Sequence, residues 1–117
     1  MDDKNTGVGA MKPADAQEWA RFTIEVKNGV IESASYECAD NATLINCAET
    51  LKGIITEKDV TDLFQMNNNA IYYNIEPELK RDELYLASVC VLAAKRAAAD
   101  WCKKNGAPLP DDDCCCT

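Results

Sequence analysis

The sequence predicts an α+β fold, in which helices pack on one face of a small antiparallel sheet and the last helix is long. Two observations carry this prediction. Alternating apolar residues flank an Asn28-Gly29 pair, which is typical of a β-hairpin. Further along the chain, the apolar residues of 82–105 recur at helical spacing. Because the strands precede the helices, we expect a sheet layer covered by a helix layer.

The predicted hairpin begins after Trp19. In its first strand the apolar residues Phe22, Ile24 and Val26 alternate with polar ones, and a second alternating run covers 30–36. A period of two places successive side chains on opposite faces of a sheet. One face of the hairpin is therefore expected to be buried, and the other to meet water.

Segments outside the hairpin define the expected domain boundaries. Residues 1–12 are polar and contain glycine, which predicts a flexible N-terminus, and residues 13–106 are expected to form one domain. A third strand is expected in either 10–17 or 70–75. Residues 107–117 read APLPDDDCCCT, which predicts a disordered, cysteine-rich acidic tail.

Two shorter helices are predicted between the hairpin and the long helix. Asn41 is a capping residue before a helix over 42–52, which Gly53 is expected to close. A further helix is expected over 56–66, where an Asn run follows. Both helices carry apolar residues at helical spacing and should cover the sheet.

The long helix over 82–105 has the strongest signals in the chain. Asp82 is expected to cap it, Lys103 and Lys104 occupy its last turn, and Gly106 follows its end. An apolar stripe this broad requires cover from most of the fold. The residues predicted to be buried are Leu84, Ala87, Val91, Ala94, Ala98 and Trp101.

Composition narrows the range of functions. The net charge of −8 disfavours nucleic-acid binding, which needs a basic face. The chain start has no signal-peptide pattern and no apolar run reaches membrane-spanning length, so a cytoplasmic protein without membrane contact is expected. Histidine, the commonest general base, is absent, and no nucleophile–base pair is visible, which predicts a protein that is not an enzyme. In a reducing compartment, seven cysteines favour metal or thiol chemistry over disulfides.

Three stretches carry a resemblance to a known family. They are FTIEVKNGVIESASYEC over 22–38, the helix end Leu51-Lys52-Gly53, and VCVLAAKRAAADW over 89–101. In order and spacing, from Pro13 to Lys104, they resemble the NifU/IscU-type iron–sulfur cluster assembly scaffolds, so that the fold is expected to be SufE/NifU-like. Members of that family hold a transient [2Fe–2S] cluster between cysteines and an aspartate and pass it on.

The resemblance also implies a set of ligands. The family's first cysteine precedes the hairpin, where this chain has Ala16, and Glu18 stands at the position of the nearby acid. Cys38 is the cysteine nearest to the second ligand position. Counting back from the Ala99-Asp100-Trp101 run places the family's third cysteine at Leu86. Cys90 lies one helical turn beyond that position. With the next helix contributing a further thiol, the candidate metal ligands are Cys38, Cys90, Cys47 and Glu18.

Several of these cysteines have a purely structural alternative. Cys47 and Cys90 would also serve as small core residues, because free cysteines are often buried. Cys102 is expected to be structural. Cys114, Cys115 and Cys116 follow three aspartates and predict either a carrier of soft metal or sulfur, or only a disordered tail.

The leading hypothesis is an iron–sulfur cluster assembly scaffold or carrier, which binds iron or a transient [2Fe–2S] cluster, with zinc as a substitute. The resemblance implies a cysteine desulfurase-type sulfur donor and apo client proteins as partners. A homodimer would supply ligands that one chain lacks. Two alternatives remain open: a cluster-free interaction module that retains the scaffold fold, and a soft-metal or thiol carrier that works through the C-terminal cysteines.

Overall fold

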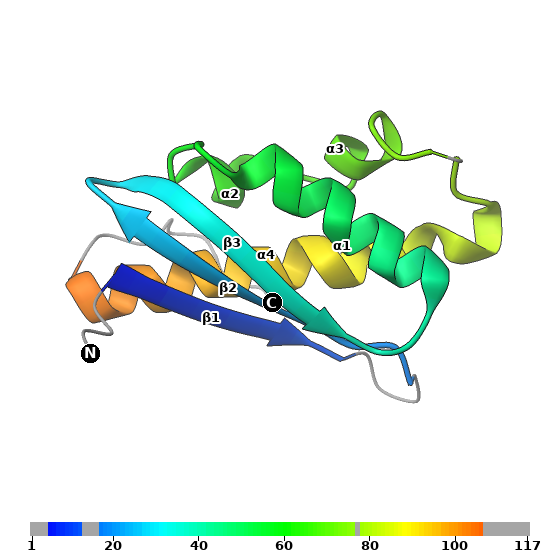
Figure 1. Cartoon of the computed structure of the whole chain (residues 1–117), viewed down its shortest axis with the longest axis horizontal. Coiled ribbons are helices and arrows are strands. Elements are labelled where there is room, and N and C mark those ends of the chain that lie inside the picture. Colours follow the sequence, from blue (N-terminus) through cyan, green and yellow to red (C-terminus); the bar gives the residue numbers. More distant parts are fainter. Residues whose placement is uncertain (1–4, 13–16, 77, 107–117) are drawn as a thin grey trace.

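The structure is a computed structural model that describes residues 5–12, 17–76 and 78–106 (Figure 1). It contains a three-stranded antiparallel sheet in the order β1-β2-β3, formed by Thr6–Met11, Ala20–Lys27 and Val30–Cys38. The helices are α1 (Ala42–Ile55), α2 (Asp62–Gln65), α3 (Asn69–Tyr72) and α4 (Leu84–Asn105), and the 3₁₀ turn η2 (Arg81–Glu83) precedes α4. The predicted α+β class, with its small antiparallel sheet and long C-terminal helix, is confirmed.

The hairpin between β2 and β3 is formed by the pair that predicted it. Asn28 and Gly29 both have positive φ angles, 56° and 80°, which a two-residue hairpin turn needs. On β2 the side chains of Phe22, Ile24 and Val26 are buried, and the residues between them face outward. One face of the sheet therefore carries the core, as predicted.

The third strand lies in a segment that was expected to be flexible. That expectation over 1–12 is wrong for Thr6–Met11, which form β1 and pair with β2. The alternative over 10–17 overlaps β1 only at Ala10 and Met11, and residues 13–16 lie outside the described residues. The alternative over 70–75 is wrong, because that segment contributes to α3. Glycine is depleted in strands, so the Gly-rich sequence TGVGAM gave little sign of pairing.

Close packing against α4 explains the glycines of β1. A Cβ atom on Gly9 would lie 2.1 Å from the backbone nitrogen of Ala97, and one on Gly7 would lie 2.2 Å from its carbonyl oxygen. Neither separation is sterically allowed. The backbone of β1 therefore rests directly on the backbone of α4, which only glycine permits.

The outer edge of β1 is bonded by side chains of α4. Asp100 Oδ2 accepts a hydrogen bond from the Val8 N–H at 2.9 Å, and Arg96 donates to the Ala10 carbonyl at 2.8 Å. Lys104 donates to the carbonyl of another β1 residue at 3.0 Å. These contacts occupy backbone groups that an incoming strand would otherwise use.

The segment after α1 pairs with the edge of β3 and does not form the helix expected over 56–66. Ile31 donates to the Lys58 carbonyl at 2.8 Å, and its own carbonyl accepts from the Glu57 N–H at 2.7 Å. Glu57 has a positive φ of 75°, which interrupts a helix. Only Asp62–Gln65 is helical, as α2, because the preceding backbone groups bond to β3.

The start of α1 is as predicted, but its end is not. The Asn41 side chain accepts a hydrogen bond from the Leu44 N–H at 3.0 Å and caps the helix. Gly53 does not close α1, which continues to Ile55 and ends at Thr56. A Cβ atom on Gly53 would meet nothing within 4 Å, so this glycine has no packing role there.

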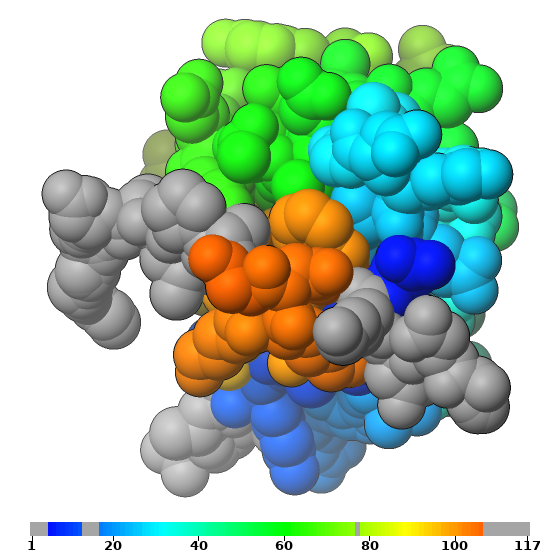
Figure 2. All heavy atoms as spheres, turned by 90° about the vertical axis from the view of Figure 1, so that its left-hand side faces the viewer, coloured from blue at the N-terminus to red at the C-terminus, as the bar shows by residue number. Residues whose placement is uncertain are grey.

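α4 lies behind the sheet and contacts β1, β2, α1 and α2 (Figure 1). Its end is as predicted, because Gly106 adopts the left-handed conformation with a φ of 66°. Its start is not, since Asp82 lies in η2 and Glu83 is the residue before the helix. Figure 2 views the C-terminal end of α4, which lies between helical residues in green and strand residues in blue and cyan.

Most of the predicted stripe of α4 is buried, including Ala87, Val91, Ala94 and Ala98. Trp101 is only partly buried and packs against the core. Leu84 is 37% exposed, so the prediction that it is buried is wrong. The large apolar side chains that remain exposed on α4 are Leu84, Tyr85 and Leu92.

Candidate functional site

Cys38 is the last residue of β3 and lies where the chain turns toward α1. Its side chain is partly buried, and the neighbouring Ala39 N–H donates to the Trp19 carbonyl at 3.0 Å. Burial raises the pKa of the Cys38 thiol, and the Asp40 carboxylate raises it further. The thiol is therefore a weaker nucleophile and metal ligand at neutral pH than a free cysteine.

Cys47 and Cys90 face the core from two helices that contact each other. Both residues are 0% exposed, Cys47 on α1 and Cys90 on α4. The Cys90 thiol donates a long hydrogen bond to the carbonyl of Leu44, with the sulfur 4.0 Å from the oxygen. Their position matches the structural alternative, in which buried cysteines act as small core residues.

The three thiols of Cys38, Cys47 and Cys90 influence one another. Burial raises the pKa of Cys90, and the nearby thiols of Cys47 and Cys38 raise it further. Burial raises the pKa of Cys47 to about 11, with a contribution from Glu83. The structure thus brings the three predicted thiols into one region, but it keeps them protonated at neutral pH.

Glu18 precedes β2 and interacts with Tyr85 in the first turn of α4. Its carboxylate bonds the hydroxyl of Tyr85, and burial together with Glu18 raises the pKa of that tyrosine. Within 5–12, 17–76 and 78–106, no group of three or more cysteine, aspartate or glutamate side chains is arranged to hold a metal ion.

The predicted set of Cys38, Cys90, Cys47 and Glu18 is therefore not assembled as a metal site. The physical reason is that two thiols are enclosed among apolar side chains, and the carboxylate is bonded to a tyrosine. Iron, zinc and a [2Fe–2S] cluster bind thiolates, so a metal at these residues would have to displace the thiol protons. Ala16 and the cysteines at 114–116 lie outside the described residues.

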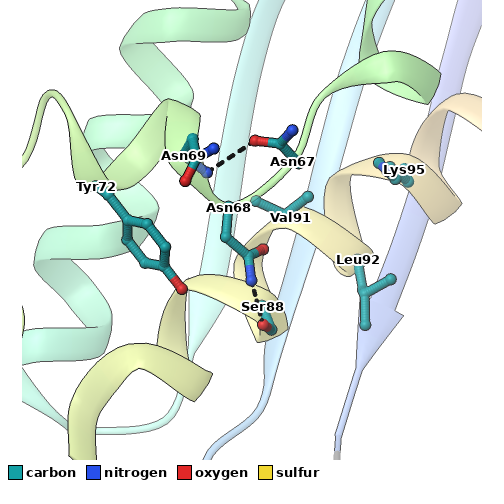
Figure 3. A pocket seen from close by; sticks show the side chains of 8 residues that line it. All are labelled: Asn67, Asn68, Asn69, Tyr72, Ser88, Val91, Leu92 and Lys95. Atoms are coloured by element: carbon teal, nitrogen blue, oxygen red, sulfur yellow. Dashed lines mark hydrogen bonds between the residues drawn. The ribbon is translucent and has the colours of Figure 1, made fainter. Parts of the chain in front are cut away.

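The surface near α3 and α4 contains three adjoining hollows. The first has a volume of about 450 Å³ and lies between α3 and α4 (Figure 3). The second, of about 210 Å³, shares Tyr72 with the first, and the third, of about 480 Å³, shares Glu78 and Leu79 with the second. We call the first two hollows together the α3–α4 groove; its lining residues are Asn67, Asn68, Asn69, Tyr72, Glu78, Leu79, Leu84, Ser88, Val91, Leu92 and Lys95.

Hydrogen bonds hold the polar side of the α3–α4 groove in place. Asn68 donates from its side-chain amide to the Ser88 hydroxyl at 2.6 Å, which ties the loop to α4 (Figure 3). Asn67 accepts from the Asn69 N–H at 2.9 Å. Tyr72 extends from α3 toward Ser88 and forms a side wall. From the sequence, the Asn run was interpreted only as a helix breaker. Its hydrogen-bonding partner on α4 lies about 20 positions away, so local patterns could not reveal the contact.

Comparison with known protein families gives no match, and comparison with curated proteins gives none either. The resemblance to iron–sulfur scaffolds thus rests on the sequence order described above. Among the residues that the structure describes, no helix combines the length and apolar character that crossing a membrane requires.

Proposed function

We propose that this chain is a cytoplasmic, non-enzymatic interaction module that shares the layout of NifU/IscU-type scaffolds and holds no iron–sulfur cluster as a monomer. The observation that supports this most directly is the full enclosure of Cys47 and Cys90. A thiol must lose its proton to bind a metal, and burial opposes that loss at both residues.

The exposed surface supports binding to another macromolecule. Four large apolar side chains near α3 and α4 remain exposed, with Tyr73 at 80% the most accessible. Beside them, the α3–α4 groove offers amide and hydroxyl groups. Apolar anchors next to hydrogen-bonding groups are typical of interaction surfaces. The other exposed apolar residues of this region are Leu84, Tyr85 and Leu92.

Anaerobic reconstitution with ferrous iron and sulfide tests the proposal. We expect no cluster absorption in the visible spectrum after desalting, because the thiols of the described residues stay protonated and enclosed. A Cys38→Ser, Cys90→Ser double variant serves as the matched control and should give the same spectrum. Stable cluster absorption in the parent protein that disappears in the folded double variant would contradict the proposal.

One observation favours a second candidate, the iron–sulfur scaffold or carrier. Cys38, Cys47 and Cys90 lie close enough for the first two to raise the pKa of the third. A sulfur donor, a client protein or a second copy of the chain would then have to open the α1–α4 interface to reach these thiols. The same reconstitution, repeated on a form lacking residues 111–117, separates this candidate from a soft-metal or thiol carrier that uses the C-terminal cysteines.

A further inference from the structure

We infer that the acidic segment 107–117 of this chain docks on the outward face of α4, with its aspartates against Lys95 and Lys103. We call this surface the cationic face of α4; it consists of Lys95, Arg96, Ala99 and Lys103. The charge of α4, the two lysines without partners and the length of the segment lead to this inference. It goes beyond the proposed function and does not depend on it.

The charge of α4 is opposite to that of the protein as a whole. The helix contains four cationic side chains and one carboxylate, that of Asp100, so its net charge is +3. The whole chain has a net charge of −8. Anionic groups are therefore attracted to α4, although the protein as a whole repels them.

Helical spacing gathers the cations that point outward. Positions 95, 99 and 103 follow one another at four-residue steps and share one face of α4. Lys103 and Arg96 are exposed, and Lys95 is half-buried. Ala97, on the opposite side of the helix, is fully buried. Figure 2 shows the last turns of α4, in orange, at the surface of the molecule.

Two of the four cations already have a role within the fold. Arg96 donates to a carbonyl of β1 at 2.8 Å, and Lys104 lies 3.3 Å from the Asp100 carboxylate. Within the part of the chain that the structure describes, Lys95 and Lys103 form no ion pair and no hydrogen bond. Their charges are therefore available to a carboxylate from another part of the chain.

The segment that follows α4 has the charge to supply that carboxylate. Residues 107–117 contain three consecutive aspartates, at 111–113, and no lysine or arginine. Their side-chain charge of −3 is equal and opposite to that of α4. The pairing of the two segments therefore neutralises both.

The segment also has the length to reach the cationic face. Gly106 ends α4 in the left-handed conformation, and Pro108 cannot continue the helix. Lys95 lies 11 positions before Gly106, which is ~16 Å along the helix at ~1.5 Å per residue. Five to seven extended residues cover about 17–25 Å. The aspartates can therefore reach every position from Lys103 back to Lys95.

The covalent connection favours this segment over other acidic occupants. A segment that is joined to the helix it contacts binds at an effective concentration on the order of 1 mM. Exposed ion pairs are individually weak, so a separate acidic partner would need many of them at once. A second copy of the chain presents the same cationic helix, and only its own segment 107–117 would fit. A carboxylate-bearing partner would have to displace the docked segment.

Zero-length cross-linking of the full chain with a carbodiimide tests this inference. The reagent joins a carboxylate to an amine where the two are in contact, and mass spectrometry of the digested monomer identifies each joined pair. We expect the aspartates at 111–113 to be joined to Lys95 at least as often as to Lys104, which is nearer to Gly106. The Asp100–Lys104 pair, at 3.3 Å, is the internal reference for the yield.

Two double variants provide matched controls. Lys95→Gln, Lys103→Gln removes the two charges without partners, and Lys27→Gln, Lys58→Gln removes two exposed lysines outside α4. With glycine amide in excess, the carbodiimide instead caps carboxylates that are free of contacts. The aspartates at 111–113 should be capped about threefold faster in the first variant than in the parent, as expected if about two thirds of the molecules are docked. The second variant should react like the parent, and circular dichroism checks the fold of both.

Three results would overturn the inference. The first is the absence of products with Lys95 while the Asp100–Lys104 product forms. The second is equal capping of the aspartates in the two double variants. The third is the loss of the Lys95 products on dilution, or their appearance only in cross-linked dimers, which would assign the face to a second copy. None of these results bears on cluster reconstitution, which tests the proposed function separately.

Discussion

Cys38, Cys47 and Cys90 carry the same functional group in three different environments. Cys38 meets solvent at the end of β3, whereas the other two are enclosed between α1 and α4. Spacing in the sequence placed all three near one another, but it could not show that the helix interface would bury two of them. Burial depends on which face of each helix meets the sheet, and a cysteine is compatible with a buried face as well as with an exposed one.

The buried thiol of Cys47 predicts a loss of stability in alkaline solution. Its pKa is about 11 in the folded protein, against an ordinary value of 9.0, so the folded state holds the proton more tightly. This contribution is present in full below pH 9 and is lost as the pH rises toward about 11. We expect the free energy of unfolding to fall in that window by up to ~1.4 kcal/mol per pH unit for this thiol.

Urea denaturation at a series of pH values measures this effect. The Cys47→Ala variant should show a smaller decrease between pH 9 and 11 than the parent, because one titrating group is gone. Cys90 also has a raised pKa and should keep part of the decrease. Parallel curves for the parent and the variant would show that Cys47 does not titrate in this range.

At the scale of elements, β1 and α4 form the closest contact in the fold. Two β1 glycines meet the α4 backbone, and three α4 side chains bond the outer edge of β1. At the other edge of the sheet, the segment around Lys58 pairs with β3 next to the hairpin. Both edge strands are thus partly covered, which limits pairing between copies of the chain.

Gly9 in β1 and Gly53 in α1 provide a matched pair of substitutions. Gly9→Ala should destabilise the protein by about 2 kcal/mol or more, because the new Cβ would meet Ala97 N at 2.1 Å and force β1 away from α4. Gly53→Ala should stabilise it by ~0.5–1 kcal/mol, since the site is helical and open. Thermal and urea unfolding measure both. Equal effects of the two substitutions would mean that β1 does not rest on α4.

Local signals explain which elements the sequence could predict. The Asn28-Gly29 turn, the Asn41 cap and the Gly106 end all depend on residues within a few positions, and all three are confirmed. β1 could not be recognised, because its glycines are required only by close packing against α4, which lies about 90 positions later in the sequence. The α3–α4 groove was missed for the same reason, since its walls come from separate elements.

For the whole molecule, α4 is the element that joins both layers. It contacts two strands of the sheet and also α1 and α2, so its buried stripe is part of the core between the sheet and the helices. A folded chain of this size unfolds cooperatively as a rule. Damage to the middle of α4 should therefore unfold the entire domain and not only one helix.

An aspartate in that stripe tests the packing directly. Ala94 is 1% exposed, and Ala94→Asp would bury a carboxylate among apolar side chains, which should cost more than ~3 kcal/mol. Ala99 is also on α4 but only partly buried, so Ala99→Asp should cost less than ~1 kcal/mol. Denaturation followed by circular dichroism and by tryptophan fluorescence should report one shared transition at lower urea for Ala94→Asp. If the two variants were equally stable, α4 could not be packed with Ala94 against the core, and the two-layer arrangement would be wrong.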